Sequence, residues 1–382
     1  MASIWTTRAS LGLACARGLA PYALREAREA GCRIVAHDAS SVTVTGTLLD
    51  AMRLNLMMRT AHRILFPVFE AEAKNLDHLY RHAVGAPWEE WLEPDGYFSV
   101  AGVVKNDTVR DTKMPALRLK DAIADRMREK CGRRPDSGRE QRGVSIFFIW
   151  RERSLRVFID TSGDPLSRRG YRMIPGDAPM QEPLAAACAM ATGWNEDTPF
   201  ISPMCGSGTP AIEAAMIAKR RAPGAIRQRF AFMSIKGYKE EGEAAWLAMK
   251  DEAVRNELPP DKMPRIVATD ISRDAVRIAR ANAKAARMEQ FISFGVCDFA
   301  ETAVPPAPGA IFMNPEYGER LGEREALKPL YRRIGAWLAD FPNHHSAILT
   351  ASPMLAKETG LKPAELIPFF NGAIDCRLVR FS

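Results

Sequence analysis

Four consecutive residues in the last third of the chain, Asn314, Pro315, Glu316 and Tyr317, follow an apolar run at residues 310–313. An aromatic exocyclic amine is a weak nucleophile because its lone pair is delocalised into the ring. A site that acts on such an amine must aim hydrogen-bond acceptors at its N–H groups. The Asn314 side-chain oxygen and the Pro315 carbonyl are such acceptors, and Tyr317 offers an aromatic face for a flipped base. The pattern predicts these three residues as catalytic, the alternative being a plain Asn-Pro turn after a strand.

A glycine loop at residues 203–209 separates a short apolar run from a helical pattern. Glycine at 206 and 208 lets the backbone approach a ligand that a Cβ atom would block. We expect Thr209 to be the N-cap of the following helix and Pro210 to occupy its first position. No Walker A lysine follows the loop, which disfavours phosphoryl transfer.

Two acidic residues, Asp270 and Asp298, each end a predicted strand. Open α/β sheets bind ligands at the carboxyl ends of their strands, so Asp270 is expected to accept both hydroxyls of an adenosine ribose. Asp298 could accept from an adenine amino group, although a strand-end cap is an equally simple explanation. Asp270 lies 62 residues beyond Gly208, where about 20 is usual. An insertion over residues 223–264 is therefore predicted.

Alternating elements must position these residues. Strands are predicted at 200–202, 265–270, 291–297, 310–313 and 346–350, with helices between them at 211–220, after Ser272 and at 327–338. This alternation indicates a mostly parallel, doubly wound sheet. Residues 366–381, with Asn371-Gly372, predict a final hairpin with a type I′ turn. A parallel sheet closed by an antiparallel hairpin is the arrangement of class I S-adenosylmethionine-dependent methyltransferases.

The first half of the chain has a different pattern. Strands are predicted at 41–45, 97–104, 144–150 and 155–160, and helices at 50–65 and 120–130, which together indicate an α+β module. The net charge is +7, and residues 110–175 contain 17 Lys or Arg against 9 Asp or Glu. A solvated basic face is the simpler explanation, but so local an excess beside a catalytic half favours nucleic acid. The predicted RNA-binding residues are Lys120, Arg133, Arg134, Arg168, Arg169 and Arg172.

Composition excludes several classes of protein. Hydrophobic residues make up 47% and charged residues 26% of 382 residues, which indicates two or three globular domains. No uncharged apolar run reaches the length of a membrane span, so we expect no membrane partner. The seven cysteines are scattered, which favours a reducing, cytoplasmic location, and the six histidines show no metal-ligand spacing, so no metal is expected. Residues 22–30 form an amphipathic helical pattern, which favours a folded N-terminus over a transit peptide.

These motifs together resemble the THUMP-domain RNA methyltransferases, specifically the bacterial 23S rRNA guanine-N2 methyltransferase family of the RlmL/YcbY type. The resemblance extends over nearly the whole chain. The segments that resemble the family are residues 53–56, 119–125, 160–163, 169–172, 178–179, 184–186, 203–209, 212–215, 314–315, 317–320 and 371–372.

The resemblance implies a fold, a cofactor and a reaction. It implies a ferredoxin-like part at residues 1–49, a THUMP RNA-binding domain at 50–162, a linker at 163–181 and a Rossmann-like methyltransferase domain at 182–382. The reaction would be methyl transfer from S-adenosylmethionine to guanine N2 in 23S rRNA, a step of rRNA processing. The implied cofactor-binding residues are Ser202, Cys205, Gly206, Gly208, Thr209, Asp270 and Asp298.

The chain departs from the family at two positions. Ser202 stands where an aspartate is usual, and Glu316 where a second proline is usual. Two kinds of alternative stay open. One keeps the chemistry but changes the substrate to tRNA guanine N2, or to adenine N6 in RNA or DNA. The other is an RNA-binding or ribosome-assembly factor whose methyltransferase half has decayed.

Overall fold

The computed structural model describes residues 3–381 except positions 108, 110, 139, 141, 173–179 and 319–320, and it leaves out the side chains of 321–323. Part of the expected linker and the family-like segments at 178–179 and 319–320 therefore lie outside the described residues. The chain forms two compact units. Unit 1 comprises Met1–Cys15, Leu24–Leu166 and Arg227–Glu252, and unit 2 comprises Ala16–Ala23, Ser167–Ile226 and Ala253–Ser382.

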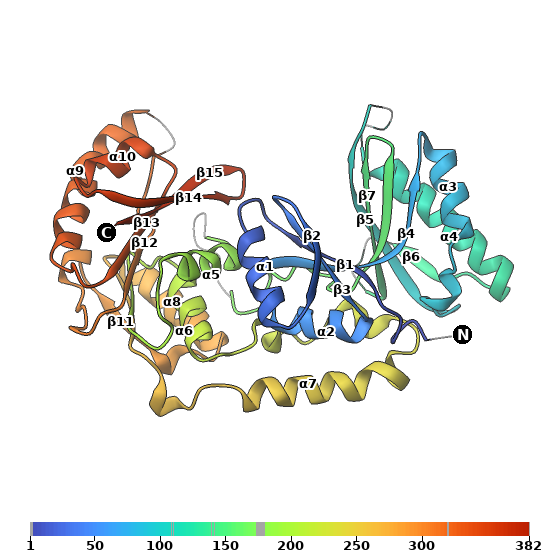
Figure 1. The fold of residues 1–382 in the computed structure, drawn as a ribbon, viewed down its shortest axis with the longest axis horizontal. Coiled ribbons are helices and arrows are strands. Elements are labelled where there is room, and N and C mark those ends of the chain that lie inside the picture. Colours follow the sequence, from blue (N-terminus) through green and yellow to red (C-terminus); the bar gives the residue numbers. More distant parts are fainter. Residues whose placement is uncertain are drawn as a thin grey trace. The chain divides into compact units, whose positions relative to one another are not determined.

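Unit 1 is built on one mixed, eight-stranded sheet of order β2-β3-β1-β4-β8-β7-β5-β6 (Figure 1). The long strand β4 joins two halves of this sheet, because it pairs with β1 on one side and with β8 on the other. The strands are β1 (Ala9–Cys15), β2 (Arg33–His37), β3 (Ser41–Gly46), β4 (Ala61–Glu72), β5 (Tyr97–Lys105), β6 (Asp136–Gly138), β7 (Val144–Arg151) and β8 (Ser154–Asp160).

The helices of unit 1 are α2 (Leu48–Met57), α3 (Leu76–Gly85) and α4 (Lys113–Cys131), together with the later part of α1 (Ala20–Glu29) and most of α7 (Glu243–Arg255). Thr47 and Asp50 form a capping box at the start of α2, which explains why this helix begins there. The expected helix over residues 50–65 is wrong in its second half, because the chain turns extended at Met58 and enters β4. Helix α2 also runs through residues 49 and 50, where we expected a domain boundary.

Unit 1 also contains a segment far away in sequence, Arg227–Glu252. Phe230, Phe232 and Trp246 form an aromatic cluster within it, with ring centroids 5.0 to 5.3 Å apart. The Trp5 indole donates to the Lys236 carbonyl at 2.9 Å, which ties the start of the chain to this segment. The predicted insertion between Gly208 and Asp270 is thus present, and its middle packs with unit 1.

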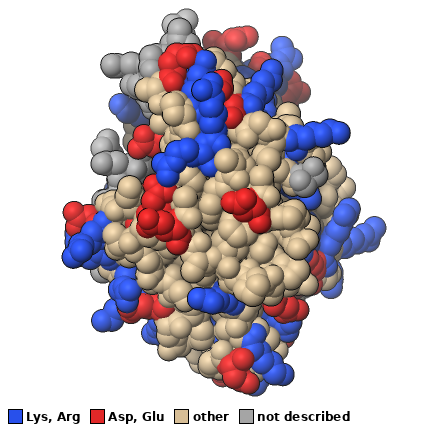
Figure 2. Space-filling view, turned by 90° about the vertical axis from the view of Figure 1, so that its left-hand side faces the viewer, with Lys and Arg blue, Asp and Glu red and all other residues tan. Residues whose placement is uncertain are grey.

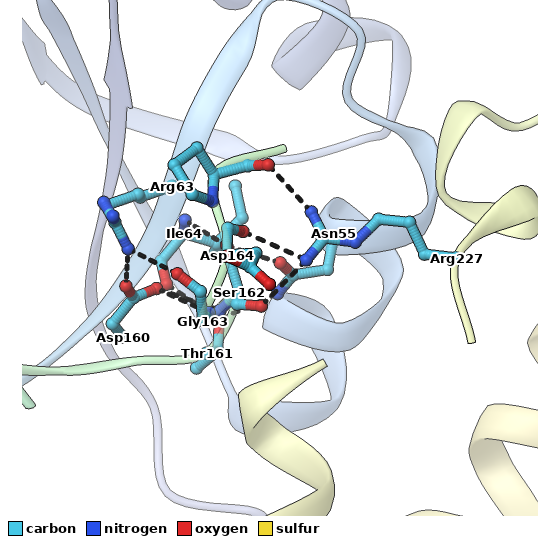
Figure 3. A network of polar contacts seen from close by, with 10 residues as sticks. Asn55, Arg63, Ile64, Asp160, Thr161, Ser162, Gly163, Asp164 and Arg227 are labelled. Atoms are coloured by element: carbon cyan, nitrogen blue, oxygen red, sulfur yellow. Dashed lines mark hydrogen bonds and ion pairs between the residues drawn. The ribbon is translucent and has the colours of Figure 1, made fainter. Parts of the chain in front are cut away.

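A buried polar network fixes the end of β8 (Figure 3). Asn55 of α2 donates to the Thr161 hydroxyl at 2.7 Å and accepts from the Ser162 hydroxyl at 2.6 Å. Arg63 of β4 donates to Asp160 and to the Gly163 carbonyl. Arg227 donates to the carbonyls of residues 162, 164 and 165. Three separate parts of the sequence therefore hold one loop.

Unit 2 is built on a seven-stranded sheet of order β11-β10-β9-β12-β13-β15-β14. The first five strands in this order are parallel, and β15 and β14 form an antiparallel hairpin at one edge. The predicted doubly wound sheet closed by a hairpin is confirmed. The strands are β9 (Phe200–Pro203), β10 (Ile266–Asp270), β11 (Ile292–Val296), β12 (Ala310–Met313), β13 (His345–Thr350), β14 (Pro363–Asn371) and β15 (Ile374–Phe381).

Helices cover both faces of this second sheet, with α5, α6 and α8 on one face and α9 and α10 on the other (Figure 1). A buried cluster that includes Ile311, Tyr331 and Ile348 packs α9 and α10 onto the sheet. No helix in the described part of the chain has both the length and the apolar character that a membrane span requires. The helices of unit 2 are α5 (Glu182–Ala191), α6 (Thr209–Ala218), α8 (Arg273–Ala285), α9 (Leu321–Ala339) and α10 (Pro353–Glu358).

The hairpin turn differs by one residue from the expected Asn-Gly turn. Asn371 pairs with Ile374, so the two loop residues are Gly372 and Ala373. Only Gly372 has a positive φ, of 64°. Glycine at the first central position is typical of a type II′ turn, whereas type I′ would need a positive φ at both positions.

Candidate functional site

The glycine loop follows β9 and lies at the carboxyl end of the parallel sheet. The Cys205 amide donates to the Thr269 carbonyl of β10 at 2.9 Å, which anchors the loop to the neighbouring strand. Gly206 has a φ of 54°, and a Cβ atom built on it would have no neighbour within 4 Å. The loop therefore presents open backbone at Gly206, which fits the close approach of a ligand.

Gly208 has a packing role that the sequence did not indicate. A Cβ atom at this position would lie 2.8 Å from the Ala279 Cβ of α8, so this glycine allows two helices to pack closely. Gly208 is also the N-cap of α6, with Thr209 as the first helical residue, so the predicted cap is wrong by one position. The Asn282 amide of α8 donates to the Ser207 carbonyl at 3.1 Å and holds the loop from the other side.

The two glycines should therefore respond differently to the same substitution. Both have positive φ values, so alanine costs about 1 kcal/mol at either position. Gly208→Ala adds overpacking of about 1–3 kcal/mol and should lower Tm by several degrees more than Gly206→Ala, measured by calorimetry. Gly206→Ala should instead weaken cofactor binding while the fold persists. Equal losses of stability in the two variants would contradict this assignment.

Asp270 and Asp298 both end strands at this edge. Asp270 accepts from the Gly206 amide at 2.9 Å and from the Ser272 amide at 2.9 Å. Its two oxygens still have acceptor capacity, because an ionised carboxylate can accept about four hydrogen bonds. Asp298 accepts from the Ala300 amide and from Arg333 of α9. The Ala300 hydrogen bond and the Arg333 guanidinium lower the pKa of Asp298 below its ordinary value.

Asn314 and Pro315 directly follow β12, which pairs in parallel with β9 and β13. They therefore lie at the same edge of the sheet as the glycine loop. The Asn314 side-chain oxygen is buried, and none of the described residues donates a hydrogen bond to it. Buried polar atoms are rarely left unpaired, so this oxygen is an acceptor held ready for a ligand N–H group. Tyr317 is half-buried, and its hydroxyl accepts from the Asn371 amide at 3.4 Å.

The other predicted cofactor residues, Ser202, Cys205 and Thr209, are buried. Ser202 lies in β9 and is 2% exposed. The Thr209 hydroxyl lies 3.2 Å from the Ser207 hydroxyl within the loop. Burial, with a smaller effect of the Asp270 carboxylate, raises the pKa of the Cys205 thiol far above neutral pH. Cys205 therefore stays protonated and is not a nucleophile.

Four further residues at this site were not found from the sequence. Ile271 is 73% exposed next to Asp270, and Val296 of the adjacent strand is 49% exposed. Two exposed apolar side chains at the carboxyl edge of a sheet fit the flat face of a ligand ring. On α9, Arg333 donates to Asp298 and Tyr331 donates to the Glu316 carbonyl. Of these four residues, only Ile271 could have been found from the sequence, because it is an apolar residue directly after Asp270.

The predicted RNA-binding residues fall into both units. Arg133 and Arg134 of unit 1 are exposed beyond the end of α4, and Arg168 of unit 2 is exposed. Lys120 is half-buried and donates to the Gly138 carbonyl. Arg172 donates to the Met180 carbonyl and pairs with Glu182. On the face drawn in Figure 2, basic and acidic side chains are interspersed, with no extended field of one sign among the described residues.

Arg169 requires a correction. It is 1% exposed and donates to Glu213 through Nε at 2.8 Å and Nη2 at 3.1 Å. The Tyr171 hydroxyl donates to the same carboxylate at 2.8 Å. Arg169 therefore holds the segment before α5 against α6 and has no surface to offer RNA.

Three family models match separate parts of the chain. Residues 169–380 match the RMKL-like methyltransferase domain. Residues 10–65 match the RlmL ferredoxin-like domain, and residues 73–159 match the THUMP domain. The first of these matches spans more than half of the chain.

Relatives and solved structures agree with these matches. The ribosomal RNA large subunit methyltransferase K/L of Magnetococcus marinus is 37% identical over 95% of this chain and 52% of its own length. The chain thus spans about half the length of the K/L relatives it matches. The Synechocystis protein slr0064, named as a candidate RNA methyltransferase, is 30% identical over 96% of this chain and 94% of its own length.

A solved structure of SMU.472, a candidate methyltransferase in complex with SAH, has 28% identity to this chain and a TM-score of 0.88, and the match covers 98% of each chain. These findings confirm the resemblance and the predicted fold class. The chain therefore belongs to the RMKL-like methyltransferase family, with a ferredoxin-like domain and a THUMP domain before its methyltransferase domain.

Proposed function

We propose that this chain is an S-adenosylmethionine-dependent RNA methyltransferase that modifies the N2 amine of a guanine in 23S rRNA. The observation that carries the proposal is the buried Asn314 oxygen, which has no hydrogen-bond partner among the described residues and lies at the same sheet edge as the open backbone of Gly206. The first is an acceptor for a base amine, and the second leaves room for a cofactor. The name of the K/L relatives and the THUMP match support large-subunit rRNA as the substrate. A cytoplasmic location stays a prediction.

The residues at the sheet edge fit the proposed cofactor. Asp270 would accept the ribose hydroxyls while it keeps its bonds to the Gly206 and Ser272 amides. Ile271 and Val296 would cover the adenine ring, since both are exposed apolar side chains at the carboxyl edge of two neighbouring strands. S-adenosylmethionine, when bound, supplies an electrophilic methyl group.

The catalytic role of the protein is to hold the amine. The Asn314 oxygen and the Pro315 carbonyl would accept its two N–H groups, which orients the nitrogen lone pair and stabilises the positive charge that develops on it. The new nitrogen–carbon bond forms as the carbon–sulfur bond breaks, and the amine afterwards loses one proton to solvent. Tyr317 would stack on the base, which must leave its helix to reach the site.

Calorimetric titration with S-adenosylmethionine and with S-adenosylhomocysteine tests the cofactor part of the proposal. We expect binding in the micromolar range. Asp270→Ala should weaken binding about 100-fold, because charge-assisted hydrogen bonds contribute about 1.5–3 kcal/mol each. Asp274→Ala is the matched control and should leave binding within about twofold, because Asp274 is exposed, pairs with Arg277 and is not assigned to the cofactor.

The same titration separates an enzyme from a decayed factor. A folded wild-type protein that binds neither compound at millimolar concentration would contradict the enzyme and leave an RNA-binding or ribosome-assembly factor. Ser202 and Glu316, the two departures from the family pattern, would then be the first residues to restore to aspartate and proline.

A further inference from the structure

Two residues outside the predicted site, one directly and one through the other, are hydrogen-bonded to the loop that is proposed to hold the base. Tyr331 of α9 is completely buried, and its hydroxyl donates to the Glu316 carbonyl at 3.1 Å. Thr350, the last residue of β13, is 1% exposed, and its hydroxyl lies 3.2 Å from that of Tyr331. We propose that Tyr331, supported by Thr350, is a positioning residue for methyl transfer that sets the peptide plane between Glu316 and Tyr317. The inference rests on the proposed function, which assigns Tyr317 to the base.

The hydrogen bonds form a chain with one direction. Because Tyr331 has a single hydroxyl proton and gives it to Glu316, the Thr350 hydroxyl must donate to Tyr331. Thr350 in turn accepts from the Ser352 amide at 3.1 Å, at the start of α10. Burial raises the pKa of Tyr331 to about 12, so it stays a donor at every pH at which the enzyme would work. This series of hydrogen bonds thus connects the start of α10 with a carbonyl of the proposed active-site loop.

The position of this carbonyl decides where the aromatic ring points. The Glu316 carbonyl belongs to the peptide that leads into Tyr317, so fixing it fixes the start of that residue. The Tyr317 hydroxyl at the other end of the side chain is held by Asn371 at 3.4 Å and lies within hydrogen-bond reach of the Cys376 thiol. The ring is therefore held at both ends, and Tyr331 supplies the contact at the backbone end. Its own side chain is buried in the core and does not reach the base.

Steady-state kinetics on rRNA distinguish positioning from a general structural role. Tyr331→Phe removes only the hydroxyl and should lower kcat at least tenfold, since a small misplacement of the reacting groups lowers the rate strongly. The KM for the cofactor should change less than twofold. Thr350→Val should lower kcat by a similar factor, whereas Thr350→Ser, which keeps the hydroxyl, should have a kcat within threefold of the wild-type value. The double variant Tyr331→Phe/Thr350→Val should have a kcat no lower than that of Tyr331→Phe, because the two hydroxyls act through the same series of hydrogen bonds.

Thr192→Val is the matched control. Thr192 is also fully buried, and its hydroxyl donates to the Ala189 carbonyl at the end of α5, outside this chain of bonds. This variant removes an equivalent buried hydroxyl and should leave kcat within twofold of the wild-type value. An equal loss of kcat in Thr192→Val would show that any buried hydroxyl has this effect and would overturn the inference.

Spectra of the protein labelled with ¹³C-tyrosine test the same point without a substrate. The chain has seven tyrosines, and Tyr317→Phe identifies the signal of Tyr317. In Tyr331→Phe the Tyr317 signal should shift or broaden while the signals of Tyr80 and Tyr97 stay in place. An unchanged Tyr317 signal would overturn the inference, even if the wild-type protein methylates no RNA. Absence of wild-type methylation with a shifted signal would instead count against the proposed function alone.

Discussion

Asn314→Ala should lower kcat/KM for methylation of rRNA about 1,000-fold. The variant removes the buried oxygen that has no partner among the described residues, and the loss of one such preorganised group costs about 100- to 1,000-fold in other enzymes. The second acceptor, the Pro315 carbonyl, would remain but could hold only one of the two N–H groups. Affinity for S-adenosylhomocysteine should stay within about twofold, since the groups assigned to the cofactor are untouched.

The control for this prediction is Asn371→Ala. Asn371 contacts the Tyr317 hydroxyl at 3.4 Å and is not assigned to the amine. Its removal should have a much smaller effect on the rate than removal of Asn314. If Asn314→Ala keeps more than a third of the wild-type activity while it binds RNA normally, the Asn314 oxygen does not grip the amine.

Glu213→Ala should lower Tm of the second unit by about 10 °C. Glu213 is 0% exposed and accepts from Arg169 and Tyr171, which are each 1% exposed. Removing one partner of a buried ion pair costs about 3–5 kcal/mol because the remaining charge is left unpaired. For a domain of this size, each kcal/mol corresponds to about 2–4 °C in Tm. Differential scanning calorimetry measures the change directly.

Asp274→Ala serves as the exposed counterpart. Asp274 and Arg277 form an ion pair at 3.3 Å in which both side chains are more than 60% exposed. Exposed pairs contribute about 0–1 kcal/mol, so Tm should fall by no more than about 4 °C. A fall of similar size in both variants would mean that the Arg169–Glu213 pair is no more important than a surface pair.

Strand ends were predictable because short-range patterns determine them. The run at 310–313 is apolar and ends at Asn-Pro, and the observed β12 has the predicted bounds. Alternation of strands and helices indicates a parallel sheet, whose carboxyl ends meet at one edge. The sequence alone therefore predicts that Gly206, Asp270 and Asn314 lie together at this edge.

The features that could not be predicted depend on contacts between residues that are far apart in the sequence. The buried charge of Arg169 is matched by Glu213, 44 residues away, and nothing near Arg169 separates it from a surface arginine. The observed hairpin turn lies one residue later than the predicted Asn-Gly turn, because the strand register, with Phe369 opposite Cys376, outweighs the local preference of Asn-Gly for the turn positions. Tyr331 was missed for the same reason, since its role depends on a carbonyl 15 residues earlier.

Nucleoside mass spectrometry of treated RNA tests the central claim most directly. The purified protein would be incubated with labelled S-adenosylmethionine and with separate 23S rRNA and tRNA fractions, all lacking prior modification, beside the Asn314→Ala variant. The proposed function predicts labelled N2-methylguanosine in 23S rRNA from the wild-type protein only. Label found in tRNA, or as N6-methyladenosine, would contradict the assigned substrate, and no label in any fraction from a protein that binds the cofactor would contradict guanine-N2 methylation altogether.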